Sequence, residues 1–196
     1  MEILGFREFN EKLDIQPITK ERLARGVSTV GKYVTIGTLD WSAVNASTLV
    51  DNGGNLLRER TDYFEHNGDI YYTKEGAAKI VPNGWRLPTT KDIEHLFHIV
   101  NDAEVFISKD FGGTDKYGLG LRLLGFYSYD MPFDNYYNGY GKNANYVIDI
   151  RTRHTFGGDV YSGMMLTYSS SLNYWKITIA PIDPKNGQSV RFVRTH

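Results

Sequence analysis

Residues 81–101 constrain the fold of this chain most, because a turn, an extended run and an amphipathic helix follow one another there. Pro82-Asn83-Gly84 is typical of a turn, since proline presets one dihedral and asparagine and glycine tolerate positive φ. Pro88 holds Leu87 in the extended region, so a helix cannot begin earlier. Thr89 is then the expected N-cap, and Asp92 three residues later resembles the second half of a capping box.

The predicted helix over residues 90–101 has one apolar face and one polar face. Its apolar residues recur at the helical spacing i, i+3, i+4 and i+7, at Ile93, Leu96, Phe97 and Val100. We expect Asp92, Glu94 and His95 on the opposite face. The turn before the helix is expected to bring Trp85 and Leu87 into a hydrophobic core.

Gly-Trp-Arg-Leu-Pro-Thr at residues 84–89, followed by such a helix, resembles the Fibrobacter succinogenes major paralogous domain family. Further stretches resemble that family in the same order: residues 36–45 (Ile-Gly-Thr-Leu-Asp-Trp-Ser-Ala-Val-Asn), residues 68–78 (Gly-Asp-Ile-Tyr-Tyr, then Ala-Ala) and residues 189–194 (Ser-Val-Arg-Phe-Val-Arg). The resemblance spans roughly residues 34–195. It implies an α+β, C-type lectin-like domain over residues 34–196, with two helices packed on a twisted, mostly antiparallel sheet with long loops.

The family usually carries cysteines at two positions where this chain has Val81 and Phe192. We expect these two apolar side chains to meet in the core without a disulfide. The predicted structural core comprises Trp41, Val81, Trp85, Leu87 and Phe192. Replacing a buried tryptophan such as Trp85 by alanine is expected to cost about 3–5 kcal/mol.

Turn residues and alternating apolar residues divide the rest of the chain into short elements. Asn67-Gly68 is the strongest two-residue hairpin signal and predicts a hairpin over residues 63–73. A short helix is expected over residues 74–80, capped by Thr73. Strands are expected over residues 33–50, 121–129, 145–154, 158–168, 172–180 and 188–195. The first and last of these strands are expected to lie close together.

Composition excludes several classes of function. The chain has no cysteine, which excludes disulfides, cysteine nucleophiles and zinc–thiolate sites. It therefore also excludes the cysteine-dependent activity of the formylglycine-generating enzymes that share the C-type lectin-like fold. The net charge of −1 leaves no basic footprint for a nucleic-acid partner. No apolar run has the length of a membrane span, and the first ten residues do not resemble a signal peptide.

Residues 1–33 lie outside the family resemblance and carry scattered apolar side chains among charges. One interpretation is a flexible leader. The other is a docking segment that orders against another chain, with Phe6, Phe9, Leu13 and Ile15 as anchors.

Residues 127–140 interleave tyrosine with asparagine, aspartate and glycine, a composition typical of adaptable recognition surfaces. The expected ligand-binding residues are Tyr129, Tyr136, Tyr137, Asn138 and Tyr140. The alternative is that half of these tyrosines are core residues, because tyrosine is intermediate in burial.

Nothing in the sequence predicts a metal site or a catalytic pair. His95 and His98 stand three residues apart on the expected helix, but no third ligand follows at useful spacing. The aspartates at positions 130, 134, 149 and 159 lack the spacing of a calcium loop. No cofactor and no enzymatic activity are expected.

These observations favour a non-enzymatic virion protein, a head or tail fibre or decoration component whose residues 1–33 bind other virion proteins. Such a protein would act as a homo-oligomer and would contact a glycan or protein on the host surface, without a membrane partner. The alternative is a bacterial cell-surface binding module for glycan or protein. An uncharacterised enzyme on the same fold is the third hypothesis.

Overall fold

The computed structural model describes residues 30–100, 102–129, 137–138, 143–154, 158–169, 171 and 174–196, and it has an α+β architecture. The helices are α3 (Lys74–Lys79) and α4 (Thr90–Ile99), followed by the 3₁₀ turns η1 (Ala103–Phe106) and η2 (Lys109–Phe111). The strands are β1 (Tyr33–Ile36), β2 (Leu39–Ser42), β3 (Tyr63–His66), β4 (Asp69–Tyr72), β5 (Phe126–Tyr127), β6 (Tyr137–Asn138), β7 (Asn143–His154), β8 (Gly158–Ser169), β9 (Tyr174–Ile182) and β10 (Val193–Thr195).

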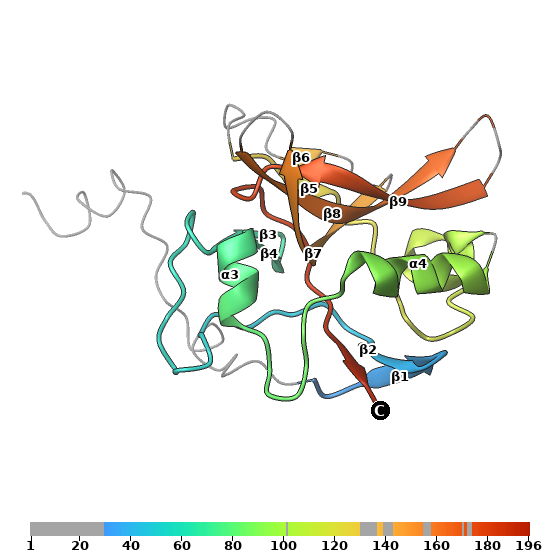
Figure 1. Ribbon diagram of the computed structural model, residues 1–196, viewed down its shortest axis with the longest axis horizontal. Coiled ribbons are helices and arrows are strands. Elements are labelled where there is room, and N and C mark those ends of the chain that lie inside the picture. The colour runs from blue at the N-terminus through green and yellow to red at the C-terminus, as the bar shows by residue number, and fades with distance from the viewer. Residues whose placement is uncertain are drawn as a thin grey trace, which may run out of the picture.

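The described strands form several small antiparallel sheets, whereas the family resemblance implies one twisted, mostly antiparallel sheet. Their orders are β1-β2-β10, β3-β4, β5-β6 and β7-β8-β9. The β7-β8-β9 sheet and the β1-β2-β10 sheet lie at opposite sides of the molecule in Figure 1, with α4 between them. β10 pairs with β2, with Val193 opposite Trp41, which confirms that the first and last predicted strands lie close together.

The segment before β10 connects these sheets. Gly187, Gln188 and Ser189 form isolated bridges to Tyr127, Tyr72 and Tyr146, which lie in β5, β4 and β7. Val193 bridges to Arg86 in the run before α4. This closing segment therefore completes the fold, because it contacts parts of the chain that have no strand pairing with one another.

The larger core cluster encloses α4. Ile93 and Leu96 of the helix are fully buried. They belong to one cluster with Trp41 of β2 and with Ile148 and Leu166 of the β7-β8-β9 sheet. The helix therefore binds the two outer sheets together by burying apolar area on both sides.

A second cluster packs around α3. Ala77 and Ile80 lie there beside Val190 and three of the predicted core residues, namely Leu87, Val81 and Phe192. Leu87 and Phe192 are buried, whereas Val81 and Trp85 are only partly buried at the edge of this cluster. Val81 and Trp85 therefore pack at the edge of the core and not at its centre. The ring of Trp85 lies 4.5 Å from the guanidinium of Arg194 and 6.0 Å from the ring of Tyr33.

Local signals position α4 as predicted at its N-terminus, but its polar face differs from the prediction. The hydroxyl of Thr89 accepts from the N–H of Asp92, and the Asp92 carboxylate accepts from the N–H of Thr89, which completes the capping box. Asp92 is nevertheless buried, because its carboxylate also binds the guanidinium of Arg86. His95 is half-buried against the β1–β2 turn, where a Cβ added at Gly37 would lie 2.0 Å from its Nε2.

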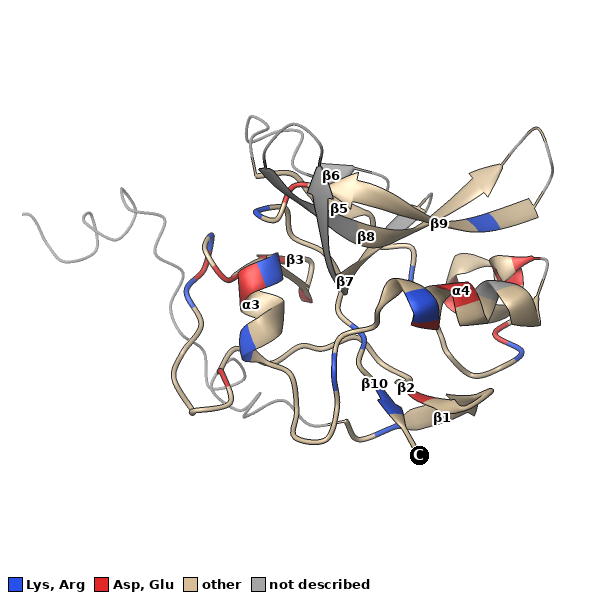
Figure 2. Ribbon diagram, viewed as in Figure 1, with Lys and Arg blue, Asp and Glu red and all other residues tan. Residues whose placement is uncertain are grey.

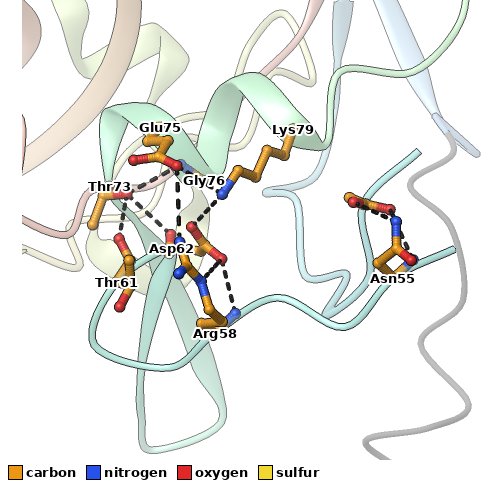
Figure 3. Close-up of polar contacts among 9 residues, drawn as sticks. Asn55, Arg58, Thr61, Asp62, Thr73, Glu75, Gly76 and Lys79 are labelled. Carbon is orange, nitrogen blue, oxygen red and sulfur yellow. Dashed lines mark hydrogen bonds and ion pairs between the residues drawn. The ribbon is translucent and has the colours of Figure 1, made fainter. Parts of the chain in front are cut away.

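The hairpin and α3 agree with the sequence prediction. Asn67 and Gly68 take φ of 50° and 82° at the tip of the β3–β4 hairpin. The hydroxyl of Thr73 caps α3 by accepting from the N–H of Gly76. Beside the cap, the buried Asp62 accepts from Lys79 at 2.7 Å and from the N–H of Arg58 at 2.9 Å (Figure 3).

Three predicted strands differ from the structure, and of residues 188–195 only Val193–Thr195 form a strand. Residues 33–50 form the β1–β2 hairpin and a loop, because Gly37 turns the chain with φ of 63°. Residues 121–129 contain only the two-residue β5. Gly120 and Gly125, both at positive φ, lie on either side of the buried leucines at positions 121, 123 and 124. None of the helices in the described ranges combines the length and apolar character that a bilayer crossing requires.

Residues 30–33 are part of the described fold. Val30 packs against the second core cluster, the carbonyl of Lys32 accepts from the N–H of Ala43, and Tyr33 begins β1. The predicted docking anchors Phe6, Phe9, Leu13 and Ile15 lie outside the described residues.

Candidate functional site

The candidate binding surface begins at Tyr129, just after β5. Its side chain is exposed at 45%. The ammonium of Lys185 lies 4.7 Å from the ring centroid and 3.3 Å from the phenol oxygen. The N–H of Tyr129 donates to the side-chain oxygen of Asn186 at 3.1 Å. We call Tyr129, Lys185 and Asn186 the Tyr129 surface. It presents an aromatic face, a cation and an amide to solvent, groups that suit glycan or protein recognition.

Aromatic packing beneath this surface fixes its position. The ring of Tyr127 stacks on Phe64 with 3.9 Å between centroids and an interplanar angle of 17°. The backbones of Tyr127 and Gly187 exchange two hydrogen bonds, of 2.8 Å and 2.9 Å. A Cβ at Gly187 would lie 2.7 Å from the Phe64 ring and 2.9 Å from the Cβ of Tyr71, so only glycine fits between them. The loop that carries Lys185 and Asn186 is therefore held beside Tyr129 by a rigid aromatic base.

The structure brings together only part of the predicted tyrosine site. The backbones of Tyr137 and Asn138 form β6 and pair with β5, opposite Tyr127 and Phe126. These positions are therefore on the strand next to the one that leads into Tyr129. Tyr136 and Tyr140 lie outside the described residues. Lys185 and Asn186 were not predicted from the sequence, since they stand more than fifty residues from Tyr129.

A polar cavity of about 240 Å³ lies elsewhere, and the sequence did not predict it. Its walls come from the segment after β2, the turn between β3 and β4, and residues near 120. The charged residues that line it are Asp69, Arg122 and Arg191. Arg191 is 1% exposed, and burial lowers the pKa of its guanidinium from the ordinary value.

A second cavity, of about 320 Å³, lies between α4 and the start of β9. Leu96, Val100 and Ala103 form one side, and Trp175 and Ile177 form the other. Trp175 also packs against the exposed Tyr168, with 5.4 Å between ring centroids. Tyr174 and Lys176 also line this groove, so its surface is divided between polar and apolar atoms, and the described side chains around it provide no reactive pair.

Metal binding has no support in the described part of the chain. No group of three or more His, Asp or Glu side chains lies there in an arrangement that could hold an ion. His95 faces the β1–β2 turn through a buried Nε2 that has no hydrogen-bond partner among the described residues, and His98 is exposed.

No protein-family model, no curated protein sequence and no solved structure matches this chain.

Proposed function

We propose that this chain is a non-enzymatic structural and adhesive protein of a virion, a head or tail fibre or decoration component. It displays a C-type lectin-like domain and is anchored to other virion proteins by its N-terminal segment, residues 1–33. The observation that supports the proposal most is geometric: β5, the strand that leads into Tyr129, lies on the side of the molecule opposite the sheet of β1, β2 and β10 (Figure 1).

The entering and leaving strands share one sheet. β1 and β10 are the two neighbours of β2, with Tyr33 opposite Ser42 and Thr195 opposite Leu39. In Figure 1 this sheet lies at one end of the molecule, and β5, which precedes Tyr129, lies near the other. A domain held at the sheet end therefore exposes the Tyr129 surface, as an adhesive domain on a particle requires.

The arrangement of elements supports the C-type lectin-like part of the proposal. Two short helices precede a second half made mainly of antiparallel strands. The last strand returns to pair with β2, near the start of the described fold. These features agree with the order that the four family-like motifs imply.

Contacts at the Tyr129 surface are suited to weak, repeated binding. One exposed aromatic ring with a neighbouring ammonium offers little contact area by itself. On a homo-oligomeric fibre, several copies would engage a host glycan or protein together and multiply that affinity by 10²–10⁴ or so. The same surface would also serve a bacterial cell-surface binding module, which is the alternative.

The test is adsorption of the purified full-length protein to host cells. The double variant Tyr129→Ala, Lys185→Ala should reduce adsorption at least about fivefold, because both exposed contact groups are removed. Tyr168→Ala is the matched control, since Tyr168 is a comparably exposed tyrosine at 47% on β8. Equal adsorption of the double variant and the unchanged protein, with equal thermal stability, would overturn the role of this surface.

A further inference from the structure

The polar cavity at Asp69, Arg122 and Arg191 has walls that are fixed by charged side chains. One wall consists of residues 43–47 after β2, another of Gly68, Asp69 and Ile70 at the β3–β4 turn, and the third of Gly120 and Arg122. These segments are far apart in the sequence, and the guanidinium groups of Arg122 and Arg191 connect them. The cavity is therefore preformed, which lowers the entropic cost of binding a ligand.

The buried guanidinium of Arg191 connects two of these walls through hydrogen bonds. Its Nη1 donates to the carbonyls of Ser42 and Leu119 at 2.7 Å and 2.8 Å, and its Nη2 donates to the carbonyl of Gly120 at 2.7 Å. Its Nε donates to the side-chain oxygen of Asn45 at 2.6 Å. These acceptors are all uncharged, so the buried guanidinium acts as a cross-link between loops.

Arg122 and Asp69 supply the binding groups. Nη1 of Arg122 binds Oδ1 of Asp69, which connects the third wall to the β3–β4 turn. Within the described residues, Oδ2 of Asp69 and Nε and Nη2 of Arg122 make no hydrogen bond. The side chain of Arg122 is 40% exposed and that of Asp69 is 19% exposed, so both reach solvent. An acceptor and donors stand side by side, an arrangement that matches two neighbouring hydroxyl groups of a sugar.

Charge and size narrow the class of ligand further. At the lining, the carboxylate of Asp69 balances the guanidinium of Arg122, whereas Arg191 is only 1% exposed and interacts electrostatically with Asp115, which lies outside the lining. The solvent-accessible charged pair is therefore formally neutral, which favours a neutral ligand over an anion. The volume of about 240 Å³ is below the roughly 300 Å³ at which pockets for drug-sized ligands begin, so the cavity fits one ring.

Apolar side chains complete the site. Val44 is exposed at 54% and lies at the lining together with Ala43, Ala46 and Ile70. Hexoses present C–H groups on one face and hydroxyls at the rim, so an apolar wall beside a charged pair suits such a ring. We infer that this cavity binds a single neutral sugar unit of a glycan, with neighbouring hydroxyls on Asp69 and Arg122.

This inference goes beyond the proposed function, because it concerns a different surface and requires neither the Tyr129 surface nor a place in a particle. It is tested on the full-length protein by saturation-transfer NMR with methyl glycosides of neutral hexoses and N-acetylhexosamines. Glucuronate and inorganic phosphate serve as the anionic probes. We expect millimolar binding of at least one neutral glycoside and none of the anions.

Two variants locate the binding. Asp69→Asn removes the charged acceptor and should weaken binding about tenfold, the effect of losing one charge-assisted hydrogen bond. Val44→Trp covers the cavity from an exposed position and should abolish binding without affecting the fold. Their controls are Arg58→Gln, which breaks the ion pair of an exposed arginine outside the cavity, and Leu56→Trp, which places a tryptophan at a position 55% exposed.

Retention of binding in both controls, together with its loss in Asp69→Asn and Val44→Trp, supports the inference. Binding that survives Val44→Trp would overturn it, as would the absence of binding by every neutral glycoside at millimolar concentration. Binding of the anionic probes alone, decreasing with added salt, would also overturn it and identify the cavity as an anion site.

Discussion

The guanidinium Nε of Arg191 donates to the side-chain oxygen of Asn45 at 2.6 Å, although the two residues stand 146 positions apart in the chain. Together with the carbonyls of Ser42, Leu119 and Gly120, this contact fixes the loop after β2 to the segment before Arg122. The closing segment of the chain thus completes both the fold and the polar cavity.

Replacing Arg191 by lysine should destabilise the protein by about 3 kcal/mol or more. An ammonium cannot reach four separated acceptors as the planar guanidinium does, and each buried acceptor left without a donor costs about 1–3 kcal/mol. Urea unfolding measures the change. Arg58→Lys is the control, because the side chain of Arg58 is 66% exposed and a lysine there keeps the positive charge beside Asp62 and Glu75. A loss for Arg191→Lys no larger than for the control would contradict this role.

Gly76→Ala should destabilise the protein by about 1–3 kcal/mol, even though alanine favours helices. A Cβ at this position would lie 1.8 Å from the backbone carbonyl oxygen of Asp62, against which α3 packs. The reverse exchange, Ala78→Gly at an exposed position of the same helix, should cost about 1 kcal/mol from helix propensity alone. A Gly76→Ala variant as stable as the unchanged protein would show that this close approach is absent.

The two tryptophans differ in their expected contribution to stability. Trp41 is fully buried in the α4 cluster, so Trp41→Ala should cost about 3–5 kcal/mol. Trp85 is partly buried and contacts the guanidinium of Arg194, which also binds Asp40 at 3.0 Å. This pair joins β10 to β2, where Figure 2 shows a basic segment next to an acidic one. Trp85→Ala should cost about 2 kcal/mol, from partial burial and one cation–π contact. An equal loss of stability in Trp41→Ala and Trp85→Ala would contradict this difference between the two tryptophans.

Asp92 should make stability dependent on pH. Burial alone would raise the pKa of its carboxyl, but hydrogen bonds from Arg86 and Thr89 outweigh this effect and lower the pKa below the ordinary value. A carboxyl whose pKa is lower in the folded state contributes stability above its unfolded pKa, about 3.9, and loses it as the pH falls through the folded pKa. Asp92→Asn should therefore be less stable at neutral pH, and the gap should narrow below about pH 4.

Thermal unfolding at a series of pH values measures this gap. Glu94→Gln, an exposed carboxylate on the same helix, controls for the loss of one negative charge and should change stability by no more than about 0.5 kcal/mol. A gap between Asp92→Asn and the unchanged protein that stays constant down to acid pH would show that Asp92 is not held in its charged form by these contacts.

Deletion of residues 1–29 should leave the domain folded and prevent its assembly into particles. The described contacts of Val30 and the β1 strand remain after this deletion. Circular dichroism and thermal unfolding check the fold, and incorporation into particles during complementation of a deletion strain checks assembly. Normal incorporation of the shortened chain would contradict the docking role of Phe6, Phe9, Leu13 and Ile15.

Local sequence signals were sufficient for the elements that depend on neighbouring residues. The capping box of Thr89 and Asp92, the Asn67-Gly68 turn and the Thr73 cap each involve residues within three positions of one another, and each is present. The burial of Trp41, Leu87 and Phe192 was predicted from the family-like motifs in which they stand, and all three are buried.

Features that depend on contacts between distant segments could not be predicted from local sequence signals. Most acceptors of Arg191 are backbone carbonyls, which carry no residue-specific signal, and the Arg122–Asp69 pair spans 53 positions. The burial of Asp92 depends on Arg86 turning toward the helix, and periodicity alone placed it on the opposite face. The division into several sheets depends on pairings between distant segments, such as β10 with β2, which the alternating pattern of apolar residues does not reveal.

We propose that this chain is a component of a virion, and quantitative mass spectrometry of purified particles, compared with the envelope fraction of the host, is the measurement to make first. We expect enrichment in particles at a fixed ratio to the capsid protein. Enrichment in the host envelope with none in particles would contradict it and would favour the bacterial cell-surface binding module.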